Sequence, residues 1–173
     1  MSDGQTFIRA AVLTVSDTRT PETDTSGKFL ADALRETGHT VTAHEIVIDD
    51  VYLLRAKVSA WIVDPEVDII ITTGGTGFGG RDSTPEALSP LFDKHVEGFG
   101  EMFRYLSIAD IGTSTIQSRA LAGIANNKAI FCVPGSTGAC RLAWEGILRD
   151  QLDSRHKPCN FVGVLGKRRE KNL

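Results

Sequence analysis

The stretch Asp68–Glu86, DIIITTGGTGFGGRDSTPE, joins an apolar run to a glycine-rich segment and then to the start of a helix. Its first part, Ile69–Ile71, is β-branched throughout, which is typical of a strand buried on both faces of a sheet. Glycine tolerates positive φ and lets backbone amides approach a ligand, and successive amides in such a turn can bind an anion. The stretch therefore predicts a buried strand that ends in an anion-binding loop, with glycines at Gly74, Gly75, Gly77, Gly79 and Gly80.

Charged residues and a helix start follow these glycines. Arg81 adds a positive charge, and Asp82 adds a carboxylate suited to a hard cation. The next residues, STPE, predict a helix with Thr84 as its N-cap and Pro85 at its first position. Together these features favour a site for a phosphate-bearing ligand. The alternative is that the glycines form only a turn.

Two better-known nucleotide motifs do not fit this loop. The segment 75–80, GTGFGG, matches the pattern GxGxxG. The dinucleotide-binding version needs a helix that opens within the glycines and an acidic residue after the next strand, roughly 20 residues on. Here Arg81 and Asp82 intervene, and the acids at that distance, Asp93 and Glu97, lie in a segment with a helical pattern. A P-loop is excluded because no Gly-Lys-Ser or Gly-Lys-Thr follows.

The composition of the chain narrows its class. It has 173 residues, 41% of them hydrophobic and 24% charged, which fits a single soluble domain over 1–173 with a flexible arm at 1–7 and a tail at 153–173. The net charge of -3 argues against nucleic acid as a partner. We find no signal region and no apolar run near the ~20 residues that span a bilayer. We therefore expect a cytoplasmic protein with no membrane partner.

Strands and helices alternate along the chain. The predicted strands are 10–15, 40–48, the run at 69–71 and 128–133; the predicted helices run from 24–27 to a stop at Gly38, over 51–62, 85–92 and 98–106, and from Gly138 onwards. Strand–helix alternation with short connections predicts an α/β fold, three-layer, with a mostly parallel central sheet and helices on both faces. The segment 109–126 stays open, because its small residues Thr113, Ser114, Thr115 and Ser118 could line a pocket or only turn the chain.

The carboxyl ends of the four predicted strands all carry polar or glycine-rich loops. In an open parallel sheet, ligands bind beyond these ends. The helices that begin near Thr25 and Gly138 point their positive ends at the same edge. Several phosphate groups with Mg²⁺ match this inventory, since Mg²⁺ takes one or two carboxylates and completes its octahedron with water and substrate phosphates. The four loops are Ser16-Asp17, Asp49-Asp50, Gly74–Asp82 and Pro134–Gly138.

This inventory favours phosphoryl or nucleotidyl transfer, which asks the protein mainly for positioning and charge neutralisation. Simpler roles remain open for the same residues. Asp49 could cap the following helix, and Asp82 could pair with Arg81. Ser136 and Thr137 could be only helix N-caps.

Several motifs, in order, resemble the MoaB/MogA family of molybdenum cofactor biosynthesis. They are AVLTVSDTRTPETDTSG (11–27), TTGGTGFGGRDSTPEAL (72–88), EGFGEMFR (97–104) and PGSTGACRLAWEGIL (134–148). The resemblance extends to RHKPCNF (155–161), and the segments 103–123 and 134–145 are most similar to the MoaB branch. It implies the family's molybdopterin-binding α/β fold, assembled as a trimer or as a hexamer of two trimers.

The resemblance also implies a reaction. Adenylyltransferase members of the family bind molybdopterin and Mg-ATP, transfer AMP to the molybdopterin phosphate and release pyrophosphate. A molybdopterin adenylyltransferase with Mg²⁺ as cofactor is therefore the expected function. The alternatives are a non-catalytic molybdopterin-binding or carrier protein of the same pathway, and an unrelated nucleotide-binding domain.

By position, Asp49 and Asp82 match the family's acids after the second strand and after the glycine loop, which implies catalytic and metal-binding roles. We expect their side chains to meet at one rim. RDSTP (81–85) resembles the active members, whereas PGST (134–137) replaces the Pro-Gly-x-Pro typical of the MogA branch. The implied substrate-binding residues are Ser16, Thr73, Gly74, Gly75, Thr76, Gly77, Arg81, Ser118, Arg119, Pro134, Gly135 and Ser136.

Overall fold

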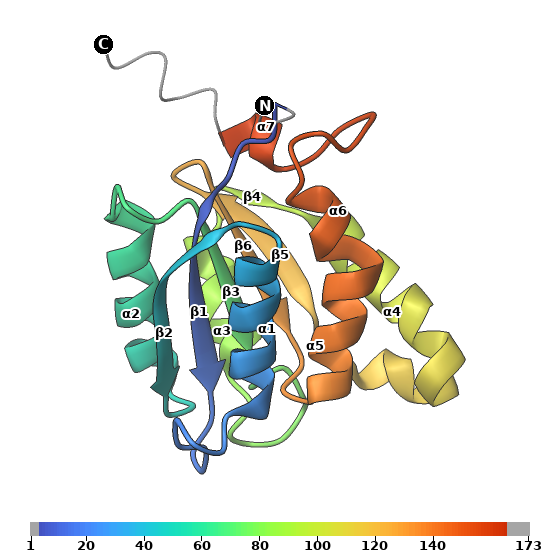
Figure 1. Ribbon diagram of the computed structural model, residues 1–173. Coiled ribbons are helices and arrows are strands. Elements are labelled where there is room, and N and C mark those ends of the chain that lie inside the picture. The colour runs from blue at the N-terminus through green and yellow to red at the C-terminus, as the bar shows by residue number, and fades with distance from the viewer. Residues whose placement is uncertain (1–3, 166–173) are drawn as a thin grey trace.

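The computed structural model describes residues 4–165, which form a six-stranded sheet flanked by helices (Figure 1). The strand order is β2-β1-β3-β6-β5-β4. The strands β2 (Thr40–Val47), β1 (Arg9–Val15), β3 (Ile69–Thr73) and β6 (Lys128–Val133) run parallel. The strands β5 (Leu121–Ala125) and β4 (Lys94–His95) are antiparallel additions at one side. The predicted α/β fold with a mostly parallel sheet is confirmed.

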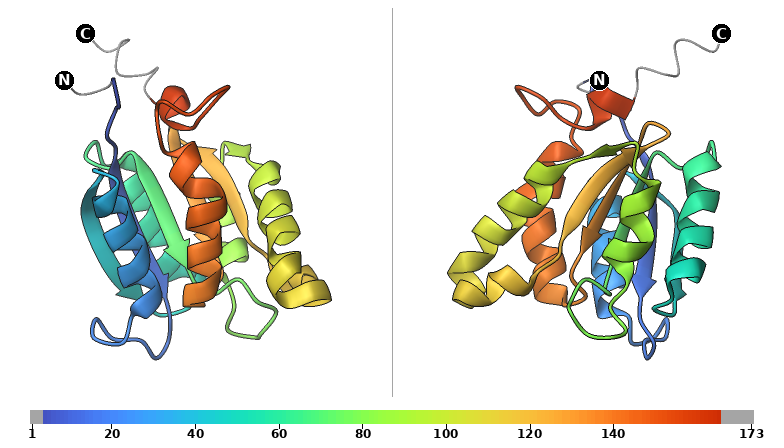
Figure 2. Two further views of the ribbon diagram at one scale, coloured as in Figure 1. Left: turned by 45° about the vertical axis from the view of Figure 1, so that its right-hand side comes forward. Right: turned by 180° about the vertical axis from the view of Figure 1, so that it is seen from behind.

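Helices cover both faces of the sheet (Figures 1 and 2). On one face lie α1 (Thr25–Glu36), α4 (Glu97–Ile111) and α5 (Thr137–Ala143), the last continued by the π-helical segment Trp144–Leu148 and by α6 (Arg149–Gln151). On the other face lie α2 (Val51–Val63) and α3 (Thr84–Leu88). The remaining helical segments are the 3₁₀ turns η1 (Ser89–Leu91) and η2 (Gly112–Gln117) and the short helix α7 (Val162–Leu165).

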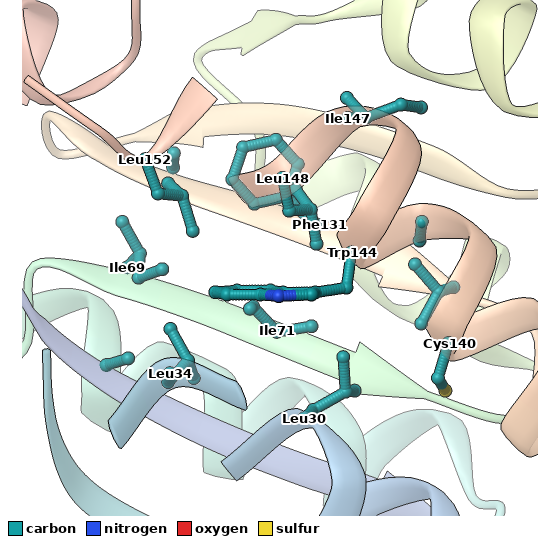
Figure 3. Close-up of a cluster of buried hydrophobic side chains, with 14 of the residues drawn as sticks. Leu30, Leu34, Ile69, Ile71, Phe131, Cys140, Trp144, Ile147, Leu148 and Leu152 are labelled. Atoms are coloured by element: carbon teal, nitrogen blue, oxygen red, sulfur yellow. The ribbon is translucent and has the colours of Figure 1, made fainter. Parts of the chain in front are cut away.

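Apolar side chains of the central strands point alternately to the two faces of the sheet, so each face has its own hydrophobic core. Ile69 and Ile71 of β3 pack with α1 and α5, whereas Ile70 packs with α2, because successive side chains of a strand point to opposite faces. On the α1 side, the indole of Trp144 has Phe131 and Leu148 on one side and Ile71 and Leu34 on the other (Figure 3). This packing holds α1 beside α5, so their first turns meet at the carboxyl edge of the sheet, where Thr25 Oγ1 and Thr137 Oγ1 are 3.0 Å apart.

The prediction was good for the first half of the chain and weaker for the second. The strands predicted at 10–15, 40–48 and 128–133 and the helices predicted before Gly38 and over 51–62 are confirmed to within a residue or two. The helix predicted over 85–92 is partly wrong, because α3 ends at Leu88 and a 3₁₀ turn follows. The helix predicted over 98–106 extends over 97–111.

The open segment 109–126 contains the end of α4, then η2, then β5. The helical interpretation around Asp93 is wrong: this residue lies between η1 and β4, and its Oδ2 accepts a hydrogen bond from Asn126 N at 2.7 Å. The strand β5, LAGIA, lacks a β-branched run because it packs closely against an aromatic ring. A Cβ on Gly123 would lie 2.2 Å from the ring of Phe92.

The predicted arm and tail contact each other where the structure describes them. Thr6 N donates to Ser154 Oγ at 2.7 Å. After Leu152 the chain packs back onto the core, since Val162 is buried and the rings of Phe131 and Phe161 meet edge to face. The apolar residues of 161–165 explain this return. Residues 1–3 and 166–173, with the basic end of the tail, lie outside the described part.

Candidate functional site

A cavity of about 570 Å³ opens beyond the carboxyl ends of β1, β3 and β6. This volume lies within the roughly 300–1,000 Å³ typical of small-molecule sites. In Figure 2 the glycine loop (green), the start of α5 (orange) and the end of α4 with η2 (yellow) lie along this edge of the sheet. Most of the predicted site residues line the cavity: Ser16, Thr73, Gly74, Gly75, Thr76, Gly77, Asp82, Ser118, Pro134, Gly135 and Ser136.

The glycine loop needs its first two glycines. Gly74 and Gly75 have φ values of 103° and 67°, in the region that favours glycine. A Cβ on Gly74 would lie 2.2 Å from Val15 O, and one on Gly75 would lie 2.4 Å from Thr84 Oγ1. The loop backbone therefore passes directly over β1 and the start of α3, and Gly74–Gly77 line the cavity. The amide of Gly74 itself donates to Val133 O at 3.0 Å.

The start of α3 differs from the prediction in one residue. Ser83, not Thr84, is the N-cap, and its side chain makes no capping bond. Thr84 is buried and donates from Oγ1 to Gly74 O at 2.9 Å. Thr84 therefore ties the helix to the glycine loop instead of capping it. Pro85, predicted at the first helical position, is the second residue of α3 and so lies in its first turn.

Asp82 lies at the inner side of the loop. Its Oδ2 accepts a hydrogen bond from Gly79 N at 2.7 Å, and its carboxylate lies against Gly77. Within residues 4–165, no protein group bonds to Asp82 Oδ1 and no ion pair joins Asp82 to Arg81. One carboxylate oxygen of Asp82 is thus available to the cavity.

Asp49 lies behind the loop and does not line the cavity. Its Oδ1 accepts hydrogen bonds from the amide of Ser83, at 3.1 Å, and from the Ser83 hydroxyl. Its Oδ2 is the atom that a Cβ on Gly75 would meet at 2.7 Å. Burial raises the pKa of Asp49, with hydrogen bonds from Ser83 opposing this and the charges of Asp82 and Asp17 adding to it. The charges of the two acids are close enough to interact, but only Asp82 lines the cavity.

The capping role that was open for Asp49 belongs to its neighbour. Asp50 Oδ1 accepts from the amides of Tyr52 and Leu53, each at 2.9 Å. Asp50 therefore caps α2, whereas the side chain of Asp49 points to the glycine loop and bonds to Ser83.

Arg81 was predicted to contact the substrate, but its side chain lies outside the cavity. Its guanidinium binds Asp17 in a fork, with Nε–Oδ2 and Nη2–Oδ1 distances of 2.8 Å each. These contacts with Arg81 lower the pKa of Asp17. The side chain of Arg81 is 68% exposed and does not line the cavity. The loop carries Arg81 outward, to an acid that follows β1.

Arg119 supports the glycine loop from the side. Its Nε donates to Gly77 O at 2.9 Å, and its Nη2 donates to Asp82 O at 3.2 Å. The guanidinium also lies 4.9 Å from the ring centre of Phe78, within the range of a cation–π contact. Arg119 does not line the cavity, so it positions the loop instead of contacting a ligand directly.

A different arginine lines the cavity. Arg19 follows β1, and its Nη1 donates to Thr23 O at 2.9 Å. None of the ion pairs in the described part of the chain involves Arg19. Sequence reasoning missed it because nothing in the polar loop after β1 shows which side chain turns inward.

Asp24 was predicted only as part of a helix start, and it also lines the cavity. Its Oδ1 accepts from Gly27 N at 2.9 Å. Its Oδ2 accepts from Thr14 Oγ1 at 2.7 Å and bonds to His44 Nε2 at 2.9 Å. The buried carboxylate therefore has its hydrogen bonds within the protein, and it fixes the first turn of α1 at the edge.

Two serines at the rim use their side-chain oxygens as acceptors, and neither hydroxyl donates to a group within residues 4–165. Ser136 Oγ accepts from Ala139 N at 3.1 Å, which confirms Ser136 as an N-cap, and Ser16 Oγ accepts from Arg19 N at 3.0 Å. Because each oxygen accepts a backbone amide, each hydroxyl proton can be donated to a ligand. The other lining residues that sequence reasoning left out of the site are Thr14, Val15, Ser26, Phe103, Ser107, Asp110, Ile111, Gln117, Ala139 and Leu142.

Of the small residues of 113–118, which could line a pocket or only turn the chain, some do one and some the other. Ser114 and Ser118 line the cavity. Thr115 is buried and donates from Oγ1 to Arg104 O at 2.8 Å, which turns the chain after α4.

The described residues contain no group of three or more His, Cys, Asp or Glu side chains that could hold a metal ion. They also contain no helix of the length and hydrophobicity needed to cross a membrane. A cation at the cavity would therefore need ligand oxygens besides those of Asp82. Mg²⁺ is suited to such a site, since it is commonly shared between one or two carboxylates, water and substrate phosphates.

The glycine loop, two serines, Arg19 and Asp82 line one cavity beyond the carboxyl ends of parallel strands. This arrangement is typical of α/β proteins that bind a small-molecule ligand with phosphate groups at the sheet edge. The family model described as "Probable molybdopterin binding domain" matches residues 11–154, and the chain belongs to this family.

Individual relatives agree. The chain is 57% identical over 159 residues to Molybdenum cofactor biosynthesis protein B of Escherichia coli strain K12, covering 92% of this chain and 94% of the relative. It is 47% identical over 147 residues to the protein of that name from Bacillus subtilis, covering 84% and 86%. A crystal structure of a Molybdenum cofactor biosynthesis protein B superposes with a TM-score of 0.85 at 40% identity, covering 95% of this chain and 98% of that one. The resemblance found in the sequence is confirmed, and these comparisons support molybdenum cofactor biosynthesis with molybdopterin as ligand.

Proposed function

We propose that this chain is a molybdopterin adenylyltransferase, which transfers AMP from Mg-ATP to the phosphate of molybdopterin and releases pyrophosphate. Membership of the family supports molybdopterin as the ligand and molybdenum cofactor biosynthesis as the pathway. The observation that carries the transfer step is that the Asp82 carboxylate and the glycine-loop backbone line one cavity with Arg19. A protein that only carries molybdopterin would need groups that bind its phosphate. It would not need a carboxylate among them, which suits a metal ion at the phosphates of ATP.

The reaction joins two anionic groups. A phosphate oxygen of molybdopterin forms a bond to the α-phosphorus of ATP, the bond from that phosphorus to the bridging oxygen breaks, and pyrophosphate leaves. The protein's task is to hold the groups in line and to offset their charge. The loop amides and the hydroxyls of Ser16 and Ser136 donate to phosphate oxygens, and Arg19 takes the charge-offsetting role expected of Arg81.

Asp82 is the residue that would hold Mg²⁺, which supplies positive charge at the ATP phosphates when it is bound. The free Oδ1 of Asp82 fits a hard cation that takes its other ligands from substrate and water. Asp49 keeps its predicted importance for the reaction in a positioning role. It holds Ser83, and its charge lies close enough to act on Asp82.

Turnover tests the proposal. Purified protein is mixed with molybdopterin, ATP and Mg²⁺, and pyrophosphate and adenylylated pterin are quantified. We expect both products from the wild type, and from Asp82→Asn a loss of turnover of about 100-fold or more, since a charged transition-state contact is removed. Tight binding of molybdopterin without products would establish the carrier instead.

Self-association as a trimer or hexamer is part of the proposal, as is a cytoplasmic location. The support on the molecule is a set of exposed apolar side chains on α4 and η2, among them Tyr105 at 72% and Ile116 at 76%. Exposed apolar side chains close together in the sequence of one helix and the turn after it can mark an interface, and a second copy of the chain is the partner that we propose for them.

A further inference from the structure

The end of α4 and the turn η2 form a second wall of the cavity, distinct in chemistry from the glycine loop. Both segments lie at the carboxyl edge of the sheet, near the loop (yellow and green in Figure 2). The loop offers backbone N–H groups, which suit phosphate. The α4–η2 wall offers the side chains of Asp110, Ile111, Ser114 and Gln117. A ligand that fills the cavity therefore meets hydrogen-bond donors on one wall and an acidic acceptor on another.

Asp110 is the carboxylate of this cavity that the protein leaves unused. Three aspartates line the cavity. Asp24 is occupied by a backbone amide, a threonine hydroxyl and a histidine, and Asp82 accepts from Gly79 N. Within residues 4–165, the carboxylate of Asp110 has no hydrogen-bond or ion-pair partner. Its two oxygens can both accept from a ligand.

The helix adds to the negative character of this wall. Asp110 lies in the last turn of α4, a 15-residue helix that has no basic residue in that turn. The carboxyl end of a helix carries partial negative charge, which favours donors and disfavours anions. Phosphate groups will therefore avoid this wall, and an N–H-bearing part of the ligand will be drawn to it.

We propose that Asp110 recognises the pterin ring of molybdopterin by accepting hydrogen bonds from its N3–H and 2-amino groups. This inference rests on the proposed function, since it concerns the same cavity and substrate. The two pterin groups are adjacent donors in one plane, and a carboxylate accepts two parallel N–H bonds from such a pair. Adenine presents one donor and one acceptor along its comparable edge, so its N1 lone pair would face a negative oxygen. Asp110 thus also discriminates between the pterin ring and the adenine ring of ATP.

The neighbours of Asp110 fit the rest of the ring. The Ser114 hydroxyl and the Gln117 amide can donate to the 4-oxo group that lies beside N3. Ile111 and Leu142 also line the cavity and offer apolar surface to the ring faces. A bicyclic, flat, hydrogen-bonding ring suits this combination better than a sugar or a free phosphate does.

The test compares two ring systems that differ at one group. Pterin-6-carboxylate carries the 2-amino group, and lumazine-6-carboxylate carries an oxygen there. Their affinities are measured by fluorescence titration for the full-length wild type, for Asp110→Asn and for Glu101→Gln. The last is the control, because Glu101 lies on the same helix but lines a different groove. ATP affinity is measured alongside as a check of the fold and of the phosphate contacts.

We expect the wild type and Glu101→Gln to bind the pterin about tenfold or more tightly than the lumazine, the scale of one hydrogen bond to a charged group. In Asp110→Asn the ratio should fall to near one, with ATP affinity unchanged. An unchanged ratio in Asp110→Asn would overturn the inference while leaving adenylyl transfer intact. If the wild type bound neither ring and formed no adenylylated product, the proposed function would fail, and this inference with it.

Discussion

Asp49 shows how a single side chain can matter for both stability and the site. Its carboxylate is buried behind the glycine loop, where it accepts two hydrogen bonds from Ser83. Burial raises its pKa, so the ionised form opposes folding. A raised acid pKa means that this cost is present above the folded-state pKa and vanishes as the pH falls below the ordinary value of 3.8.

Asp49→Asn should separate these two effects. The amide keeps an acceptor for Ser83 N but carries no charge, so the variant should melt at or above the wild-type temperature near neutral pH. The difference should shrink as the pH is lowered through about 4, since both proteins are then neutral at this position. Turnover should fall because the charge beside Asp82 is gone. Thermal unfolding across this pH range is the measurement, and a large loss of stability at neutral pH would contradict the account.

The two arginines after β1 and β3 give a second residue-scale prediction. Arg19 lines the cavity, whereas Arg81 is exposed and paired with Asp17. Arg19→Ala should therefore raise the KM for ATP by about tenfold or more, the scale of a lost charged hydrogen bond, and Arg81→Ala should change it less than threefold. Steady-state kinetics of both variants decide this. If both substitutions raised the KM for ATP equally, or Arg81→Ala raised it more, Arg81 and not Arg19 would be the phosphate contact.

These residues also show what the sequence can predict. Gly74, Gly75 and Asp82 were predictable because a glycine pair after a buried strand restricts the backbone, and Asp82 follows within the same loop. The inward turn of Arg19 and the outward turn of Arg81 were not. Both follow polar loops, and the direction of a long side chain depends on a partner, here Asp17, that lies 64 residues away in the sequence.

At the scale of elements, the glycine loop is held by its neighbours more than by its own sequence. Thr84 ties it to α3, and Arg119, which follows η2, donates to the carbonyls of Gly77 and Asp82. Two segments far apart in the chain therefore fix one loop. The short η2–β5 connection gains a role that its weak sequence pattern did not indicate.

Arg119→Ala should loosen this loop. Loss of charged hydrogen bonds to two carbonyls should cost about 2 kcal/mol of unfolding free energy, and the amides of 76–82 should exchange faster with deuterium than in the wild type. Arg141→Ala is the matched control, since Arg141 stacks on Phe29 and, among residues 4–165, forms an ion pair only with the exposed Glu145. Protection of 76–82 that stays at the wild-type level in Arg119→Ala would show that the loop does not depend on the clamp.

Elements with strong periodicity were predictable, and those that depend on tertiary contacts were not. The β-branched runs of β1, β3 and β6 and the apolar stripe of α1 predict their own structure. The strands β4 and β5 form because they pair with each other and with β6, and Gly123 is needed where Phe92 crosses. A local pattern cannot show such a pairing.

At the scale of the whole molecule, topology brings the site together. Parallel strands deliver their following loops to one edge, and the Trp144 core holds α1 beside α5 there. The sheet order made this convergence predictable. The contribution of α4 was not predictable and that of η2 stayed open, because the antiparallel β4 and β5 that precede and follow them carry no signal of a parallel unit.

Assembly is the prediction that belongs to this scale. Tyr105 and Ile108 on α4 are exposed, and we expect a second copy to cover them. Tyr105→Glu should shift the protein from a trimer or hexamer to a monomer in analytical ultracentrifugation, because a charge would be buried in the interface. Tyr52→Glu, on the exposed face of α2, should leave the assembly unchanged. A wild-type monomer, or dissociation only by Tyr52→Glu, would exclude α4 as the interface.

The central claim is that AMP passes from ATP to molybdopterin at the carboxyl edge of the sheet. A single-turnover reaction with ATP carrying a radioactive α-phosphate tests it most directly. We expect that, with Mg²⁺ present, the label appears on the pterin as fast as pyrophosphate forms, and that Asp82→Asn slows both together. Label that stays on ATP while molybdopterin is bound, or that moves at the same rate in Asp82→Asn, would contradict it.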